Sequence, residues 1–247
     1  MTPPLQAMAP ITLADGSAYA MLLNNGGGMV GGDRLRVEAE LGADAAARIT
    51  TASAGKVYRT IGPAASHETA IRLAPGARLD YLPDHLIPHA GAALVQRLTV
   101  AMEPGSRAIL YAALAAGRIA RGERFAFRRV EDLLEVRYAG RPILMSRAVL
   151  EPALRRLDGF GVMANFNYVA SLVVAGEPAR DWHSVARRLA AVVEAAGAAG
   201  GASPLAVTGC IVRWMASGAE ELRRNLAVFY AAAAQAAFDE SPPALRK

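Results

Sequence analysis

The chain has little of what several classes of protein depend on. Cys210 is the only cysteine among 247 residues, which excludes an intramolecular disulfide and any cysteine-rich zinc site. No run of 18 or more uninterrupted apolar residues occurs, and the first residues lack the positive charge and apolar core of a secretory signal. We therefore predict a single domain over residues 1–247 that resides in the cytoplasm and has no membrane partner.

Lysine is also scarce, since only two of the 27 basic residues are lysine. The formal net charge of +5 permits either an acidic protein partner or a nucleic acid. Between Arg118 and Arg129 arginines interleave with Phe125 and Phe127, a mixture that single-strand-binding surfaces use. On a strand the two phenylalanines would share one side, which favours core aromatics behind a solvated basic face. A basic nucleic-acid-binding β module remains the alternative function.

What the chain does contain is a long series of short, alternating apolar runs. Between residues 18 and 150 these runs are separated by Gly and Pro, a pattern typical of many short strands. Pro75-Gly76 and Pro104-Gly105 lie in similar segments 29 residues apart, and Leu41–Asp44 is a looser copy. Pro-Gly suits the centre of a type II turn between two strands. This repeat predicts a mainly β fold with coiled or stacked, β-helix-like sheet layers, and two ordinary hairpins are the alternative.

Two C-terminal α-helices are predicted after residue 180, because apolar residues there recur at helical spacing. The first helix is capped by Asp181 and ended by Gly197, and a flexible stretch follows over 197–201. A last strand is predicted over Val207–Met215. The second helix starts with Ser217 and Glu220 as its capping box, and the tail after Asp239 is expected to fray.

Two motifs suggest enzymes, but each lacks a required part. Gly26, Gly28 and Gly31 match the spacing of GxGxxG, yet a strand pattern follows where a pyrophosphate-binding helix should begin. Ser53 and Lys56 match SxxK, but the SDN and KTG motifs of that chemistry are absent, and the Gly-Lys pair lacks the other residues of a P-loop. An enzyme using the glycine loop is therefore the third choice, and we predict no catalytic residues.

His85 and His89 are the histidines with metal-ligating spacing, and imidazole suits nickel and zinc. Pro83 and Pro88 disfavour a helix, and on a straight strand the two rings would lie about 13 Å apart. Only a turn would bring them to one ion.

The glycine segment and a second motif carry a family resemblance. Gly26–Asp33 followed by Thr50–Arg59 resembles the paired GGxVGGD and TTxxxxKVYR signature of UreD/UreH urease accessory proteins. This sequence departs from the family pattern at two places. Relatives carry additional residues before the segment matching Leu5-Gln6, and they often read Pro-Gln-Glu where this chain has Pro83–His85. Further similar stretches lie at residues 75–83, 117–118, 122–125 and 212–215.

The resemblance implies a role in nickel delivery. Such proteins are β-rich with two helices and assemble with a second accessory protein and a nickel-carrying GTPase, and the complex docks on apo-urease subunits. It implies no turnover by this chain, no tightly bound cofactor, nickel only in transit, no nucleic-acid partner, and a dimer within the complex.

We hypothesise that the glycine loop and the segment Thr51–Arg59 lie together as a partner surface or channel lining. Asp33 would guide a divalent cation as a hard oxygen donor, and the side chains of the second segment would bind a partner or fix the loop. The alternative is a plain turn beside a plain strand end. The partner or channel candidates are Gly31, Gly32, Asp33, Thr51, Lys56, Tyr58 and Arg59, and the transient metal candidates are Asp33, His85 and His89.

Overall fold

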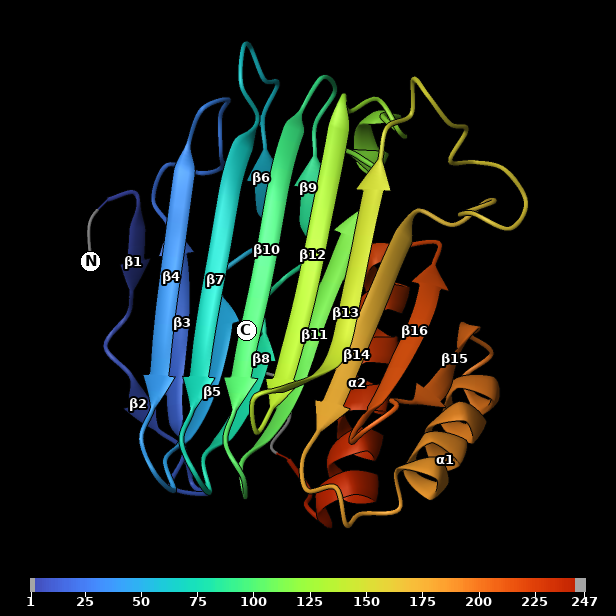
Figure 1. Cartoon of the computed structure of the whole chain (residues 1–247). Helices are drawn as coiled ribbons and strands as arrows, with labels where there is room; N and C mark the ends of the chain where they lie inside the picture. The colour runs from blue at the N-terminus through green and yellow to red at the C-terminus, as the bar shows by residue number, and fades with distance from the viewer. Residues whose placement is uncertain (1–2, 243–247) are drawn as a thin grey trace.

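Two β-sheets face each other, and two helices cover the outer face of the larger sheet (Figure 1). The computed structural model describes residues 3–242. The larger sheet runs in the order β1 (Leu5–Ala7), β3 (Ala18–Asn24), β5 (Ala46–Thr51), β8 (Arg78–Leu82), β11 (Arg107–Ala115), β14 (Tyr168–Ala175), β16 (Cys210–Ala216) and β15 (Ala199–Pro204), and is joined by β2 (Ile11–Thr12), β6 (Gly55–Val57) and β9 (Leu86–Pro88). The smaller sheet runs in the order β13 (Arg141–Leu150), β12 (Arg129–Tyr138), β10 (Ala93–Met102), β7 (Ala65–Leu73) and β4 (Arg34–Leu41).

The chain coils between these sheets. Strands β4, β7 and β10 pair in parallel in the smaller sheet, and each is followed by a turn into the parallel strands β5, β8 and β11 of the larger one. At the three turns Asp44, Gly76 and Gly105 have φ of 58°, 73° and 82°, as the third residue of a type II turn requires. Since β7 and β8 belong to different sheets, the hairpin alternative is wrong, and the β-helix-like layers are confirmed.

Both predicted helices are present. Helix α1 spans Trp182–Ala195 and is capped by the Asp181 carboxylate, which accepts a hydrogen bond from the backbone N–H of Ser184 at 3.0 Å. Gly197 follows with φ of 64°. Helix α2 spans Ala219–Phe238 and packs its apolar stripe against the larger sheet. No helix within residues 3–242 is long and apolar enough to cross a membrane.

Two boundary predictions were wrong. Instead of a flexible stretch over 197–201, β15 pairs with β16 at the sheet edge. Gly200 serves close packing, because a Cβ there would lie 2.3 Å from the carbonyl oxygen of Arg213. The last strand begins at Cys210, three residues later than expected.

The start of α2 also differs from its prediction. Gly218 is the N-cap, and the Glu221 carboxylate rather than Glu220 accepts a hydrogen bond from the Ser217 backbone N–H, at 2.8 Å.

The Arg/Phe stretch is not a strand. It contains the short 3-10 helix η1 (Ile119–Arg121) and then an irregular segment up to β12. Phe125 adopts φ of 54°, and Phe127 is buried. The expected separation of core aromatics from solvated arginines is nevertheless present, because Phe127 joins the core while Arg128 is exposed.

Candidate functional site

The glycine loop lies directly against the segment that follows β5. The Met29 backbone N–H donates to the Lys56 carbonyl at 2.8 Å, and the Tyr58 N–H donates to the Met29 carbonyl at 2.8 Å. These bonds form a parallel bridge between Met29 and Val57. The structure therefore brings together the two segments that the sequence singled out, and their function stays a prediction.

Two glycines are required for this contact. A Cβ on Gly28 would lie 2.7 Å from Cε2 of Tyr58 and 2.8 Å from the Lys56 carbonyl oxygen. A Cβ on Gly31 would lie 2.7 Å from Cγ2 of Thr60. Both distances are shorter than side-chain contacts allow, so the motif encodes close approach of two backbones.

The polar candidates in the loop hold its shape. The Asp33 carboxylate accepts a hydrogen bond from the Val30 backbone N–H at 2.9 Å, and its own N–H donates to the Val30 carbonyl. The Tyr58 hydroxyl donates to the Gly27 carbonyl at 3.2 Å. The Gly32 N–H donates to the Pro63 carbonyl. Tyr58 thus fixes the neighbouring loop, as one branch of the hypothesis expects.

A cavity of about 290 Å³ lies behind this loop, between the two sheets. Gly27 and Gly28 line it from the loop, and Thr51 and Lys56 line it from the second motif. Asp33 lies outside its described lining. Of the seven partner or channel candidates, Thr51 and Lys56 are therefore the ones that face this cavity.

Sequence reasoning missed three polar residues of the cavity wall. Gln96 on β10 is in register with His67 on β7 and with Asp132 on β12. The Gln96 amide N–H donates to the Asp132 carboxylate at 3.0 Å, and its side chain also hydrogen-bonds that of His67. We call these three residues the polar ladder. His67 and Gln96 are 29 residues apart, like the turn glycines, so aligning the repeat was the available signal.

The polar ladder stands out in a largely apolar interior, where Thr69 is the next inward residue after His67 on β7. Two residues before each member, Ala65, Leu94 and Val130 belong to one core cluster. Further along the same strands, a second cluster takes up the inward positions. Alternate residues of a strand share a face, so the ladder occupies the core-facing phase at a single level between two apolar clusters.

Burial sets the charge of the ladder. Burial lowers the pKa of His67, against the opposing hydrogen bond with Gln96, so the imidazole is neutral at pH 7. Burial raises the pKa of Asp132, against the hydrogen bond from Gln96. A neutral imidazole and a carboxylate that burial leaves under-compensated are both groups that a divalent cation would stabilise.

A second cavity, of about 350 Å³, adjoins the first. Both are lined by Gln96, Asp132 and Ala112, so the ladder stands where the two meet. Arg147 and Arg213 line the second cavity on the side of β13 and β16. The hollow interior therefore extends from the glycine loop past the ladder toward the far strands.

The candidate histidines face different neighbours. The His85 ring meets Tyr168 edge-on at 5.3 Å, whereas the His89 ring meets Tyr58 edge-on at 5.0 Å. Nδ1 of His85 lies 3.3 Å from the Asp84 carboxylate and forms no hydrogen bond with the described residues. Within residues 3–242 no group of three or more His, Cys, Asp or Glu side chains is placed to hold a metal ion. A shared ion stays an untested prediction.

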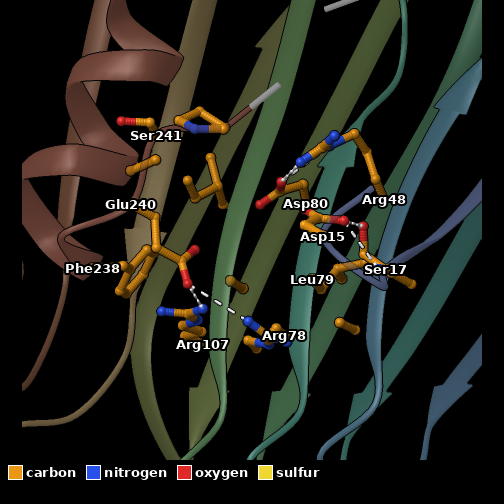
Figure 2. A pocket seen from close by; sticks show the side chains of 16 residues that line it. Asp15, Ser17, Arg48, Arg78, Leu79, Asp80, Arg107, Phe238, Glu240 and Ser241 are labelled. Carbon is orange, nitrogen blue, oxygen red and sulfur yellow. Dashed lines mark hydrogen bonds and ion pairs between the residues drawn. The ribbon is translucent and has the colours of Figure 1, made fainter. Parts of the chain in front are cut away.

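A third cavity, of about 240 Å³, lies beside the end of α2 (Figure 2). Arg48 donates to Asp80 at 3.0 Å, and Glu240 pairs with Arg107. Glu240 is thus held, although the tail after Asp239 was expected to fray; residues 243–247 lie outside the described part of the chain. The charged lining is balanced, with Arg48, Arg78 and Arg107 against Asp15, Asp80 and Glu240. Because the charges balance, the ion pairs of this cavity are better explained as contacts that hold the end of α2 against the larger sheet than as an ion-binding site.

Comparison with known proteins identifies the family. The family model described as UreD urease accessory protein matches residues 1–247. The chain is 31% identical over 252 residues to the urease accessory protein UreD of Herpetosiphon aurantiacus, covering 99% of this chain and 88% of that protein. It is 28% identical over 221 residues to the urease accessory protein UreH of Helicobacter pylori, covering 90% and 82%. These relatives support a role in urease maturation, and the chain belongs to the UreD family of urease accessory proteins.

Proposed function

We propose that the chain is a non-catalytic, cytoplasmic scaffold that assists nickel insertion into apo-urease. It acts in a complex with a second accessory protein and a nickel-carrying GTPase, which hydrolyses the nucleotide. Nickel is its cargo, held only in transit. Family membership supports the urease part of this proposal, and the hollow interior supports the transit part.

The observation that carries the transit part is the position of the polar ladder. A core normally consists of apolar side chains, and a polar group buried there without a partner costs about 1–3 kcal/mol. Here three in-register strands each place a polar side chain at the same inward level, joined through Gln96; all three border the first cavity, and Gln96 and Asp132 also border the second. Packing alone gives no reason for such a level.

The chemistry of the ladder suits transfer rather than storage. His67 offers an imidazole nitrogen and Asp132 offers carboxylate oxygens, both of which ligate nickel. An ion beside either side chain keeps most of its coordination positions for water. An ion held this way exchanges readily, as a cargo must.

The end of the cavity nearest the glycine loop is formed by the two sequence motifs. Lys56 and Thr51 line this end, and the close backbone contact at Gly28 fixes its wall. The Thr51 hydroxyl accepts a hydrogen bond from the Asp84 N–H at 2.8 Å, so the end of β5 is tied to the segment between β8 and β9. We therefore assign the two sequence motifs to the wall of the transit cavity.

Co-expression tests this function. Urease structural subunits are produced with the other accessory proteins, with and without this chain, and the nickel content and activity of the purified urease are measured. We expect both to be substantially lower without the chain. Equal nickel loading in the two preparations would refute the proposed function.

A further inference from the structure

The connection between β13 and β14, residues 151–167, is firmly held in place. Leu157 and Met163 are buried, at 4% and 5% exposure, in or beside the core. Arg124 donates to the Phe166 carbonyl at 3.0 Å and to the Asn167 side chain at 3.1 Å. These contacts fix the irregular backbone of this connection, which is called the 151–167 loop below.

The same loop presents apolar side chains to solvent. Phe160 is fully exposed and Leu154 is 80% exposed. Phe160 occupies the second position of a tight turn, in which Gly161 has φ of 81° and the Val162 N–H donates to the Gly159 carbonyl at 3.1 Å. A tight turn thus holds a fully exposed aromatic ring outward, where it is available to a partner surface.

Net positive charge is concentrated in this loop and in the Arg/Phe stretch beside it. The Arg/Phe stretch, residues 118–129, packs beside the 151–167 loop through Arg124, and both lie at the same end of the molecule (Figure 1). Together the two segments contain seven arginines and three carboxylates, which is +4 of the chain's formal charge of +5. Arg155 and Arg121 are among the exposed arginines of this group.

The surroundings favour a protein over a nucleic acid. Single-strand-binding surfaces stack successive bases on several exposed rings, and Phe160 is the one exposed ring of these two segments. Phe127 is buried, and the Phe125 ring is covered by the Arg124 guanidinium, 4.4 Å from the ring centre. Phe160 and Leu154 instead offer one aromatic and one aliphatic anchor on a loop that also exposes Arg155, side-chain types that protein interfaces use.

We propose that the 151–167 loop is a docking element for a urease-maturation partner whose surface carries an apolar pocket ringed by Asp and Glu. Phe160 and Leu154 fill the pocket, and the arginines of residues 118–129 and 151–156 meet the carboxylates. This inference rests on the proposed function for the set of partners, and it adds the surface and the chemistry by which the partner is recognised.

Binding measurements with the full chain test the surface. The double variant Phe160→Ser with Leu154→Ser is titrated against purified apo-urease subunits and against each of the other urease accessory proteins. We expect at least about tenfold weaker binding to one of them, because anchors at an interface centre dominate its affinity. Arg155→Glu should weaken binding to the same protein, and this loss should shrink as salt increases.

Met145→Ser is the matched control, because Met145 is 66% exposed on β13, outside the 151–167 loop. It should bind like the wild-type chain, and all variants should show unchanged thermal unfolding. Wild-type affinity of the double variant for every partner would overturn the docking surface alone. Salt-sensitive retention on DNA or RNA that Arg155→Glu abolishes would overturn it in favour of a nucleic acid. Failure of the wild-type chain to bind any of these proteins would overturn both this surface and the proposed function.

Discussion

The two faces of the larger sheet are packed in opposite ways. Toward the helices, inward residues such as Trp214 and Phe229 form one continuous apolar cluster, with their rings edge-on at 5.0 Å. Toward the smaller sheet, the interior is divided into two clusters with the cavities and the polar ladder between them. The same strands supply both faces by alternation, as Ile109 and Leu110 on β11 do.

This difference separates stability from function within one sheet. The helix side can be sealed because its residues need only exclude water. The side facing the smaller sheet keeps a hollow that the three polar side chains border. Natural proteins accept such local cost where a site is required.

The helix side should show the largest loss of stability. Phe229 is 1% exposed, so Phe229→Ala should lower the free energy of unfolding by about 3–5 kcal/mol by leaving a cavity. Chemical denaturation measures the change. Val228→Ala is the control, since Val228 is 43% exposed. A loss below about 1 kcal/mol for Phe229→Ala would contradict dense packing on this side.

The wall of the cavity should respond next. Gly28→Ala introduces a Cβ 2.8 Å from the Lys56 carbonyl oxygen and should lower the free energy of unfolding by about 1–3 kcal/mol. Gly42→Ala serves as control, because nothing lies within 4 Å of a Cβ there. Equal unfolding midpoints for the two variants would show that the close approach of the two motifs is not required.

A smaller loss is expected at the turn before β4. Asp33→Ala removes the acceptor for the Val30 N–H and should cost about 0.5–1.5 kcal/mol while the chain stays folded. We also expect lower nickel-dependent urease activation. Asp15→Ala is the matched control, since Asp15 likewise accepts a backbone N–H, from Ser17 at 3.0 Å, away from the glycine loop. Unchanged activation with Asp33→Ala would remove Asp33 from the mechanism.

A substitution in the polar ladder should raise the free energy of unfolding, whereas the three changes above lower it. Because burial raises the pKa of Asp132 in the folded chain, the wild-type protein loses stability as pH rises through that pKa. Asp132→Asn removes this loss while its amide oxygen still accepts from Gln96. Its free energy of unfolding should therefore exceed that of wild type at high pH, and the difference should shrink as pH falls through the pKa of Asp132. Urea denaturation from about pH 3 to pH 8 measures it, because this range begins below the ordinary carboxyl pKa of 3.8, and a constant difference would contradict a raised pKa for Asp132.

The sequence predicted the individual turns, strands and helices better than the register in which the strands pair. The Pro75-Gly76 turn and the amphipathic stripe of α2 follow from local rules, since turn and helix preferences depend on near neighbours. The polar ladder depends on the register between strands about 30 residues apart, which no local pattern specifies. Strand β15 was missed because glycine has a low strand propensity, whereas the packing of Gly200 against Trp214 depends on tertiary structure.

The central claim is that nickel passes through the hollow between the sheets. Ala112 lies on the inward face of β11 with Leu110 and lines both adjoining cavities, so Ala112→Met should obstruct them. Ala231→Met, on the exposed side of α2, is the matched control. The decisive measurement is the nickel content of urease matured with each variant, after both are shown to bind the partner proteins like wild type. We predict a marked loss of nickel with Ala112→Met and none with Ala231→Met. Equal nickel content with the two variants would contradict transit through this interior.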